Sequence, residues 1–279
     1  MKYSTAILLT LCFIILCDGK LATEFHGFPE ENIDLKQTII SKLIEGDILV
    51  EPRVNGKVVI GSDFSTQLTN RRRGLTLGSI WPNGIIPYVI HPALSSYKSL
   101  IESSMREWEN GTCLSFVPYD KSKHGLVYLD IRTKNNFGCY TKVGYKRPRR
   151  PVPSPHLVNL APGCFWRLII LHELGHVIGF YHEHSRPDRD DHVKILWDNI
   201  IPGYETEFKK YPINSLGHPY DLKSLMHYGP KMFSRNGKDT IQSLDPRNPL
   251  ILNQYISVSD REQVNDRYNC RRRGKRWIL

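Results

Sequence analysis

The sequence predicts an α+β fold arranged as two lobes. Residues 85–178 mix β-prone apolar segments with two segments whose apolar residues recur at helical spacing. Beyond Gly179 the sequence becomes irregular and contains the prolines Pro187, Pro202, Pro212 and Pro219. We therefore expect an upper lobe with a twisted mixed sheet and two helices, a loop-rich lower lobe with one helix, and a cleft between the lobes.

The N-terminal residues 1–19 have the features of a secretory signal peptide. Lys2 supplies the positive start, and the apolar run from Ala6 to Cys17 is too short to span a bilayer. No later segment approaches transmembrane length, so we expect a secreted, extracellular protein without a membrane anchor. The length of 279 residues suits one or two domains, and 40% hydrophobic residues suffice for a core.

Residues 20–73 are polar and have few periodic segments, which is typical of a propeptide rather than a folded module. We expect only a short helix there, over residues 37–43. Arg71, Arg72 and Arg73 end the segment and offer a cleavage site to a trypsin-like activating protease.

The elements of the upper lobe follow in order. A strand is predicted at Ile85–Ile90, and then a helix over residues 95–110 with Ser95 or Ser96 as its N-cap. Three further strands are expected at residues 114–117, 126–131 and 157–160. A second helix should run over residues 165–178 and be buried through its apolar run at 168–171.

A terminal helix is expected over residues 259–268, where Val264 and Tyr268 share one face. Ser259 is its predicted N-cap, and Glu262 lies at the spacing that completes a capping box.

Six cysteines are present, of which Cys12 and Cys17 fall in the signal segment. An even number remains, which in a secreted chain suggests two disulfides; these cysteines are Cys113, Cys139, Cys164 and Cys270. Four cysteines allow three pairings, and spacing alone does not choose among them. The sequence also contains one glycosylation sequon, at Asn110.

The net charge is +10, with basic clusters at residues 71–73, 146–150 and 271–276. Such a balance is compatible with nucleic acid, anionic glycans or a membrane surface. No nucleic-acid-binding motif accompanies the charge, so we favour solvated loops and a processing site and expect no nucleic-acid partner. Contact with an anionic glycan stays open.

The most informative segment spans residues 172–188. His172 and His176 are four residues apart, so both imidazoles lie on one face of a helix and can bind one zinc ion. Gly179 permits a sharp turn that returns His182 to the same ion. Three protein ligands with a fourth position for water define a catalytic zinc site, and Glu173 can act as the general base beside it.

The same residues carry a resemblance to a known family. The motif from His172 to His182 is similar to that of the metzincins, and its continuation to Asp190 resembles the astacin family. The segment Ser224–Tyr228 resembles that family's Met-turn. Looser matches lie at residues 81–88, 111–116, 138–140, 219–221 and 233–237, so the resemblance covers about residues 40–270.

The resemblance implies a zincin-type catalytic domain over residues 74–270, with the zinc helix in the upper lobe and a basic tail at 271–279. It implies a monomeric zinc endopeptidase with one Zn²⁺ per chain that acts on proteins or peptides. It also implies the disulfides Cys113–Cys270 and Cys139–Cys164.

Three more residues gain roles from the resemblance. Tyr228 would donate a hydrogen bond to the oxyanion, and Met226 would pack beneath the histidines. Glu183 would bind the N-terminus that activation frees, because a buried carboxylate needs such a partner. His184, His192 and His227 are not assigned to the metal.

The propeptide contains a departure from the family pattern. Gly46 and Asp47 match a motif whose aspartate binds the zinc in place of water and keeps the precursor latent, but Ile44 stands where the family has an aromatic residue. Residues 251–255 lack the glycine and arginine common in relatives, which leaves the substrate preference open.

Two other functions remain as alternatives. The chain could be a catalytically idle secreted binding or toxin-like protein on the same fold, although the presence of Glu173 and all three histidines argues against this. It could also be a basic glycan-binding protein, a property that is compatible with catalysis.

Overall fold

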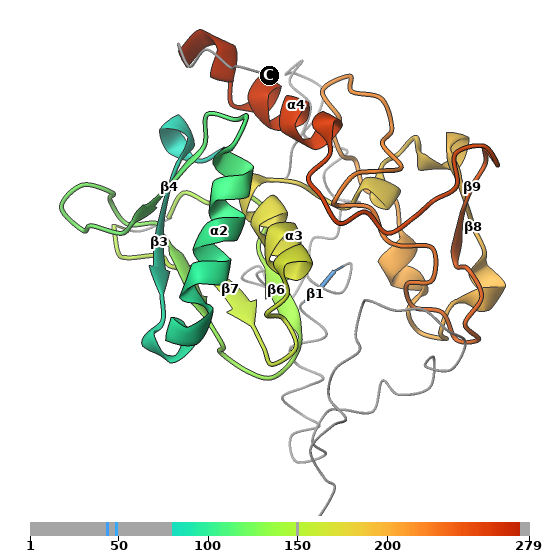
Figure 1. Cartoon of the computed structure of the whole chain (residues 1–279), viewed down its shortest axis with the longest axis horizontal. Coiled ribbons are helices and arrows are strands. Elements are labelled where there is room, and N and C mark those ends of the chain that lie inside the picture. The colour runs from blue at the N-terminus through green and yellow to red at the C-terminus, as the bar shows by residue number, and fades with distance from the viewer. Residues whose placement is uncertain (1–42, 45–47, 50–79, 149–150, 274–279) are drawn as a thin grey trace, which may run out of the picture.

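Figure 1 shows the computed structural model of the chain, which describes residues 43–44, 48–49, 80–148 and 151–273. The predicted signal peptide, Asp47 and the cleavage site at 71–73 lie outside the described residues. The helix expected over residues 37–43 lies outside them too, except for Leu43, which is in the strand Leu43–Ile44 rather than in a helix. Among the described residues, no helix is long and apolar enough to cross a membrane.

The main sheet is mixed, as predicted. Its described strands lie in the order β1-β2-β6-β7-β5-β3-β4. Strands β3, β4, β5 and β7 are parallel, whereas β6 runs antiparallel to β7. The bounds are β1 Leu43–Ile44, β2 Ile48–Leu49, β3 Ile85–Ile90, β4 Ser115–Pro118, β5 Leu129–Arg132, β6 Cys139–Thr141 and β7 His156–Leu160.

The predicted strands are present, with shifted ends. Strand β3 has the predicted bounds, β4 begins one residue later than expected, and β7 one residue earlier. Strand β5 begins at Leu129 rather than at Leu126, whose carbonyl bonds the loop residue Ser154 instead of a strand. Strand β6 was not predicted, because three residues are too few to show an alternating pattern.

Helix α2 corrects one prediction. It spans Lys98–Glu109 and follows a 3-10 turn at Pro92–Tyr97, so neither Ser95 nor Ser96 is its N-cap. The ring of His91 caps the preceding turn by accepting a hydrogen bond from the backbone of Ala93. Helix α2 lies beside α3 over one face of the sheet (Figure 1).

Helix α3 spans Arg167–Ile178 and begins two residues later than predicted. The last carbonyls of a helix have no partner within it. Here the indole Nε1 of Trp81 donates to the carbonyl of Val177 at 2.8 Å, and the hydroxyl of Tyr268 donates to that of Ile178 at 2.8 Å. Gly179 then adopts φ +124°, which redirects the chain at the helix end.

Helix α4 spans Val258–Arg267 and corrects a second prediction. Its capping box is formed by Ser257 and Asp260, two residues before the predicted Ser259 and Glu262. Its buried side chains, among them Val264, join the core around the main sheet. The helix therefore contributes its apolar contact to the core of the upper lobe.

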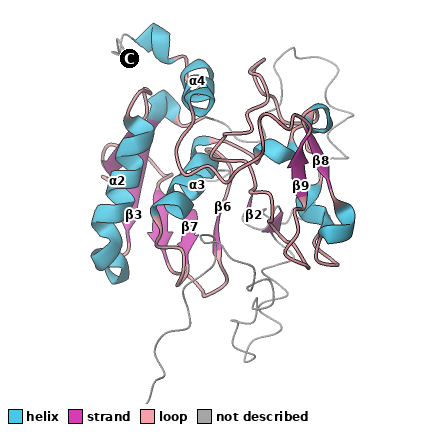
Figure 2. Cartoon of the chain, turned by 45° about the vertical axis from the view of Figure 1, so that its right-hand side comes forward, coloured by secondary structure: helices cyan, strands magenta, loops and turns pink. Residues whose placement is uncertain are grey.

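Two separate cores correspond to the two predicted lobes. The first core lies between the main sheet and helices α2, α3 and α4. The second core surrounds the two-stranded sheet of β8 Val193–Ile195 and β9 Ile241–Ser243, and includes Phe208 and Tyr228. Loops and short 3-10 turns dominate this part (Figure 2); the turns are Glu183–Ser185, Arg189–Asp191, Trp197–Asn199 and Glu205–Phe208.

Both implied disulfides are present in the structure. Cys113 and Cys270 join the start of β4 to the residues after α4, with Cα atoms 5.2 Å apart. Cys139 and Cys164 join β6 to the segment that precedes α3, with Cα atoms 5.8 Å apart. The second bond therefore links the main sheet to the segment that leads into the helix with the histidine motif.

Candidate metal centre

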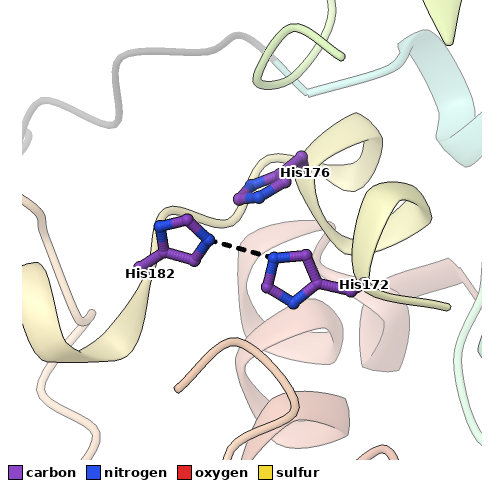
Figure 3. A group of neighbouring side chains, drawn as sticks. All are labelled: His172, His176 and His182. Atoms are coloured by element: carbon purple, nitrogen blue, oxygen red, sulfur yellow. Dashed lines mark hydrogen bonds between the residues drawn. The ribbon is translucent and has the colours of Figure 1, made fainter. Parts of the chain in front are cut away.

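The structure brings the three predicted histidines together. Helix α3 carries His172 and His176, and the turn at Gly179 returns His182 to them (Figure 3). One ring nitrogen from each residue lies within 4.8 Å of the other two. His176 and His182 are fully buried, and His172 is half-buried.

Hydrogen bonds orient the first two rings. The Nδ1 atom of His172 lies 3.1 Å from the carbonyl oxygen of Leu225, and that of His176 lies 2.9 Å from the carbonyl of Phe180. A carbonyl can only accept, so each Nδ1 carries the proton and each Nε2 presents a lone pair. This tautomer is the one that a metal at Nε2 requires.

The spacing of one nitrogen pair is close to that around a tetrahedral ion. The Nε2 atoms of His172 and His182 are 3.0 Å apart. Two nitrogens that each bind zinc at 2.0–2.1 Å in a tetrahedron are separated by about 3.3 Å. Three convergent imidazoles thus form a donor set suited to Zn²⁺, and they are the one such group of histidine, cysteine or acidic side chains among the described residues.

The predicted catalytic and supporting residues surround this group. Glu173 follows the first histidine on α3 and is 1% exposed. The ring of Tyr228 lies 4.6 Å from that of His182 and stacks at 3.9 Å on that of His184. Met226 is fully buried against α3, where a Cβ atom added to Gly175 would lie only 2.5 Å from its sulfur.

The segment 224–228, which we call the Met-turn, contacts both parts of the histidine motif. The carbonyl of Leu225 accepts from His172, and the carbonyl of Met226 accepts from the backbone N–H of Glu183 at 3.0 Å. Two segments that lie about 50 residues apart in the sequence are thus in contact at this group of histidines.

Glu183 is buried and already has partners. Its Oε1 accepts from Nη1 of Arg186 at 2.9 Å and from the backbone of Asp221 at 2.8 Å. Burial raises the pKa of Glu183 to about 8, although Arg186 opposes this effect. A cavity of about 30 Å³, room for about one water molecule, adjoins Glu183 and is also lined by Gln263 and Arg267 of α4.

His184 and His227 lie outside the triad. His227 is buried between the hydroxyl of Tyr220 and the carbonyl of Tyr228, each 2.7 Å from a ring nitrogen, and burial lowers its pKa to about 4. Burial also lowers the pKa of His184, whose Nε2 lies 3.0 Å from the carbonyl of Glu207.

Sequence reasoning gave no role to Arg186, Tyr220 or Asp260, which hold residues of the site in place. Arg186 and Tyr220 lie inside the segments that resemble the family, so their position was visible but their contacts were not.

Asn110 is exposed at the end of α2, where a glycan would have room.

Comparison with known proteins agrees with this geometry. Residues 75–269 match the family model named Astacin, which describes a peptidase family. Zinc metalloproteinase nas-6 of Caenorhabditis elegans is 36% identical over 290 residues, which cover 98% of this chain and 78% of that protein. Zinc metalloproteinase nas-15 of the same organism is 40% identical over 203 residues, but the match spans only 34% of its length and 71% of this chain.

A solved structure shows the same fold. High choriolytic enzyme 1, a hatching enzyme zinc-protease from the medaka fish Oryzias latipes, superposes with a TM-score of 0.61 at 35% identity. The match covers 69% of this chain and 94% of that one. The chain is therefore a member of the astacin family of zinc metalloproteases.

Proposed function

We propose that this chain is a secreted endopeptidase that hydrolyses peptide bonds in proteins and is made as a latent precursor. We further propose that His172, His176 and His182 hold one Zn²⁺. The observation that carries the proposal is the convergence of three imidazoles, two of which have Nδ1 committed to backbone carbonyls and Nε2 turned toward the others.

The chemistry follows from the residues around that group. When bound, zinc supplies Lewis-acid catalysis, which lets water attack a peptide carbonyl near neutral pH. The carboxylate of Glu173 takes a proton from the attacking water and delivers it to the amine as the C–N bond breaks. The hydroxyl of Tyr228, whose ring packs on His182, donates a hydrogen bond to the oxygen that becomes negative.

Strand β6 is the proposed docking site for an extended peptide, because it becomes an edge of the sheet once its partner β2 leaves with the propeptide. The residues after β6 reach the metal centre, because the backbone N–H of Gly144 donates to the carbonyl of His176 at 2.9 Å. A peptide can add to such an edge through main-chain hydrogen bonds. In the full chain a propeptide strand already lies there, since Ile48 of β2 pairs with Thr141 of β6.

This pairing supports the proposed latency. Asp47 immediately precedes Ile48 in the sequence, and Ile48 pairs with β6, the strand that contacts the histidine helix α3. We propose that the Asp47 carboxylate occupies the metal position that water needs. Cleavage by a trypsin-like protease at Arg71–Arg73 would release the propeptide, and Glu183 would bind the new N-terminus near the cavity beside it.

Secretion is proposed from residues 1–19 and fits the covalent structure. Disulfides persist in oxidising compartments, and the structure contains two. Exposure of Asn110 is compatible with a glycan on its side chain.

The proposal is tested by a peptidase assay on the trypsin-treated chain. We expect cleavage of a protein substrate, loss of cleavage with a zinc chelator, and recovery when zinc is added back. An activated, zinc-loaded chain that binds but never cleaves a broad peptide library would support the idle binding protein instead.

A further inference from the structure

A buried carboxylate on α4 contacts the Met-turn. Asp260 is 0% exposed. Its Oδ1 accepts from the hydroxyl of Ser224 at 2.7 Å, and its Oδ2 accepts from the backbone N–H of Leu225 at 2.9 Å. These partners lie 35 and 36 residues away in the sequence, so the contacts are tertiary and not part of the helix cap.

We propose that Asp260 is a positioning residue for the metal ligand His172 and that it acts through Leu225. The two polar groups of that residue have different partners: its N–H donates to Asp260, and its C=O accepts from Nδ1 of His172. The carboxylate thereby fixes the backbone whose carbonyl sets the tautomer and direction of the ring. The inference rests on the zinc site proposed above.

The hydrogen-bond pattern shows why a carboxylate suits this position. Asp260 receives a third hydrogen bond, from the backbone N–H of Ser257 at 3.0 Å. All three partners donate, and an ionised carboxylate is a pure acceptor. The hydroxyl of Ser224 extends this hydrogen-bond network along the Met-turn, because it accepts from the backbone N–H of Met226 at 3.0 Å.

The same side chain also caps α4, so a test must separate the two roles. The cap includes a hydrogen bond from the N–H of Asp260 to the hydroxyl of Ser257 at 2.9 Å. Ser257→Ala removes that bond, together with the hydrogen bond from its hydroxyl to Oδ2 of Asp221 at 2.6 Å, and leaves the Asp260 carboxylate on the Met-turn. It is therefore the matched control: it should lower the melting temperature without changing zinc affinity.

The experiment measures the zinc dissociation constant of the trypsin-activated chain by competition with a chelator, together with the absorption spectrum of the Co²⁺-loaded protein. Partners that orient a metal ligand typically contribute 10–100-fold to metal affinity. We expect Asp260→Ala to weaken zinc binding by about 10-fold, the lower end, because it acts through one intervening residue. Its Co²⁺ spectrum should shift as well.

Asp260→Asn keeps the shape of the side chain and guards against a failure of Asp260→Ala to fold. Its amide oxygen can still accept from Leu225, but the charge is lost, so we expect a smaller yet measurable loss of zinc affinity.

Wild-type affinity and an unchanged Co²⁺ spectrum in Asp260→Asn would overturn the proposal. An equal loss in Ser257→Ala would overturn it too, because the helix cap alone would then explain the effect. A wild-type chain without tight zinc would instead refute the metal site itself.

Discussion

At the scale of single residues, the histidine motif is predictable because one helix and one turn contain it. Spacing alone places His172 and His176 on the same face of α3, and Gly179 explains the return of His182. The contacts of Asp260 and Arg186 are different in kind. Asp260 joins segments that are distant in sequence, and no local pattern encodes such partners. Arg186 and Glu183 are only three residues apart, but that spacing does not show that the charge pair is buried.

Glu173 is the residue on which the proposed chemistry depends most. Glu173→Gln keeps the volume of this buried side chain but cannot take a proton from water. Proton transfer contributes roughly 10²–10⁴-fold, so we expect kcat for peptide cleavage to fall by about that factor while zinc content stays the same. The control is Glu262→Gln on the exposed side of α4. Near-normal turnover in zinc-loaded Glu173→Gln would remove Glu173 from the mechanism.

At the scale of elements, local signals located the helices but not always their ends. Ser259 and Glu262 have the same three-residue spacing as the true capping pair Ser257 and Asp260. The structure selects the earlier pair, whose aspartate also bonds the Met-turn. Strands β6, β8 and β9 have three residues each, which is too short for a period-two pattern to stand out.

The packing of α3 on the Met-turn gives a prediction for Gly175. A Cβ atom there would lie 2.5 Å from the sulfur of Met226 and 3.3 Å from the ring of Trp108. Overpacking costs about 1–3 kcal/mol, while alanine gains up to about 1 kcal/mol of helix propensity over glycine. Gly175→Ala should therefore reduce the free energy of unfolding by about 1–2 kcal/mol, as measured by denaturant titration.

A matched control for that variant is Gly229→Ala. Gly229 is also buried, but its added Cβ would meet only Leu252, at an ordinary contact distance of 3.4 Å. We expect little change in stability there. Equal effects at both glycines would show that the close approach of α3 to Met226 is not the cause of the stability loss in Gly175→Ala.

At the scale of the whole molecule, the α+β class and the two lobes were predictable from composition shifts along the chain. The side on which α4 packs was not predictable, because its buried residues fit either core. Only the fold places Val264 beside the main sheet. The cysteine pairing also required the family resemblance, since spacing allowed three pairings. The cleft between the lobes and the propeptide contacts of Asp47 remain predictions.

The two disulfides should contribute unequally to stability. Cys113 and Cys270 close a loop with a sequence separation of 157, against 25 for Cys139 and Cys164. In the chain-entropy model the longer loop stabilises by about 1.6 kcal/mol more. Double Cys→Ser variants compared by denaturant unfolding should show the larger loss for the 113–270 pair. The opposite order would mean that local contacts, rather than loop closure, set their contributions.

Latency involves the propeptide and the catalytic domain together. If Asp47 blocks the metal position, the uncut Asp47→Ala precursor should hydrolyse peptides measurably while the uncut wild type stays nearly inactive. Asp63→Ala, also in the propeptide, is the control and should stay latent. Full latency of Asp47→Ala would instead assign the block to steric cover by strands β1 and β2 along β6.

The most direct test of the proposed metal centre is the zinc content of the trypsin-activated chain after dialysis, compared with that of His176→Ala. His176 lies at the centre of the motif and is fully buried, whereas His192 stacks on Tyr220 away from the triad and serves as the control. We expect about one equivalent of zinc in the wild type and in His192→Ala, and far less in folded His176→Ala. A full equivalent of tightly bound zinc in His176→Ala would contradict the three-histidine site.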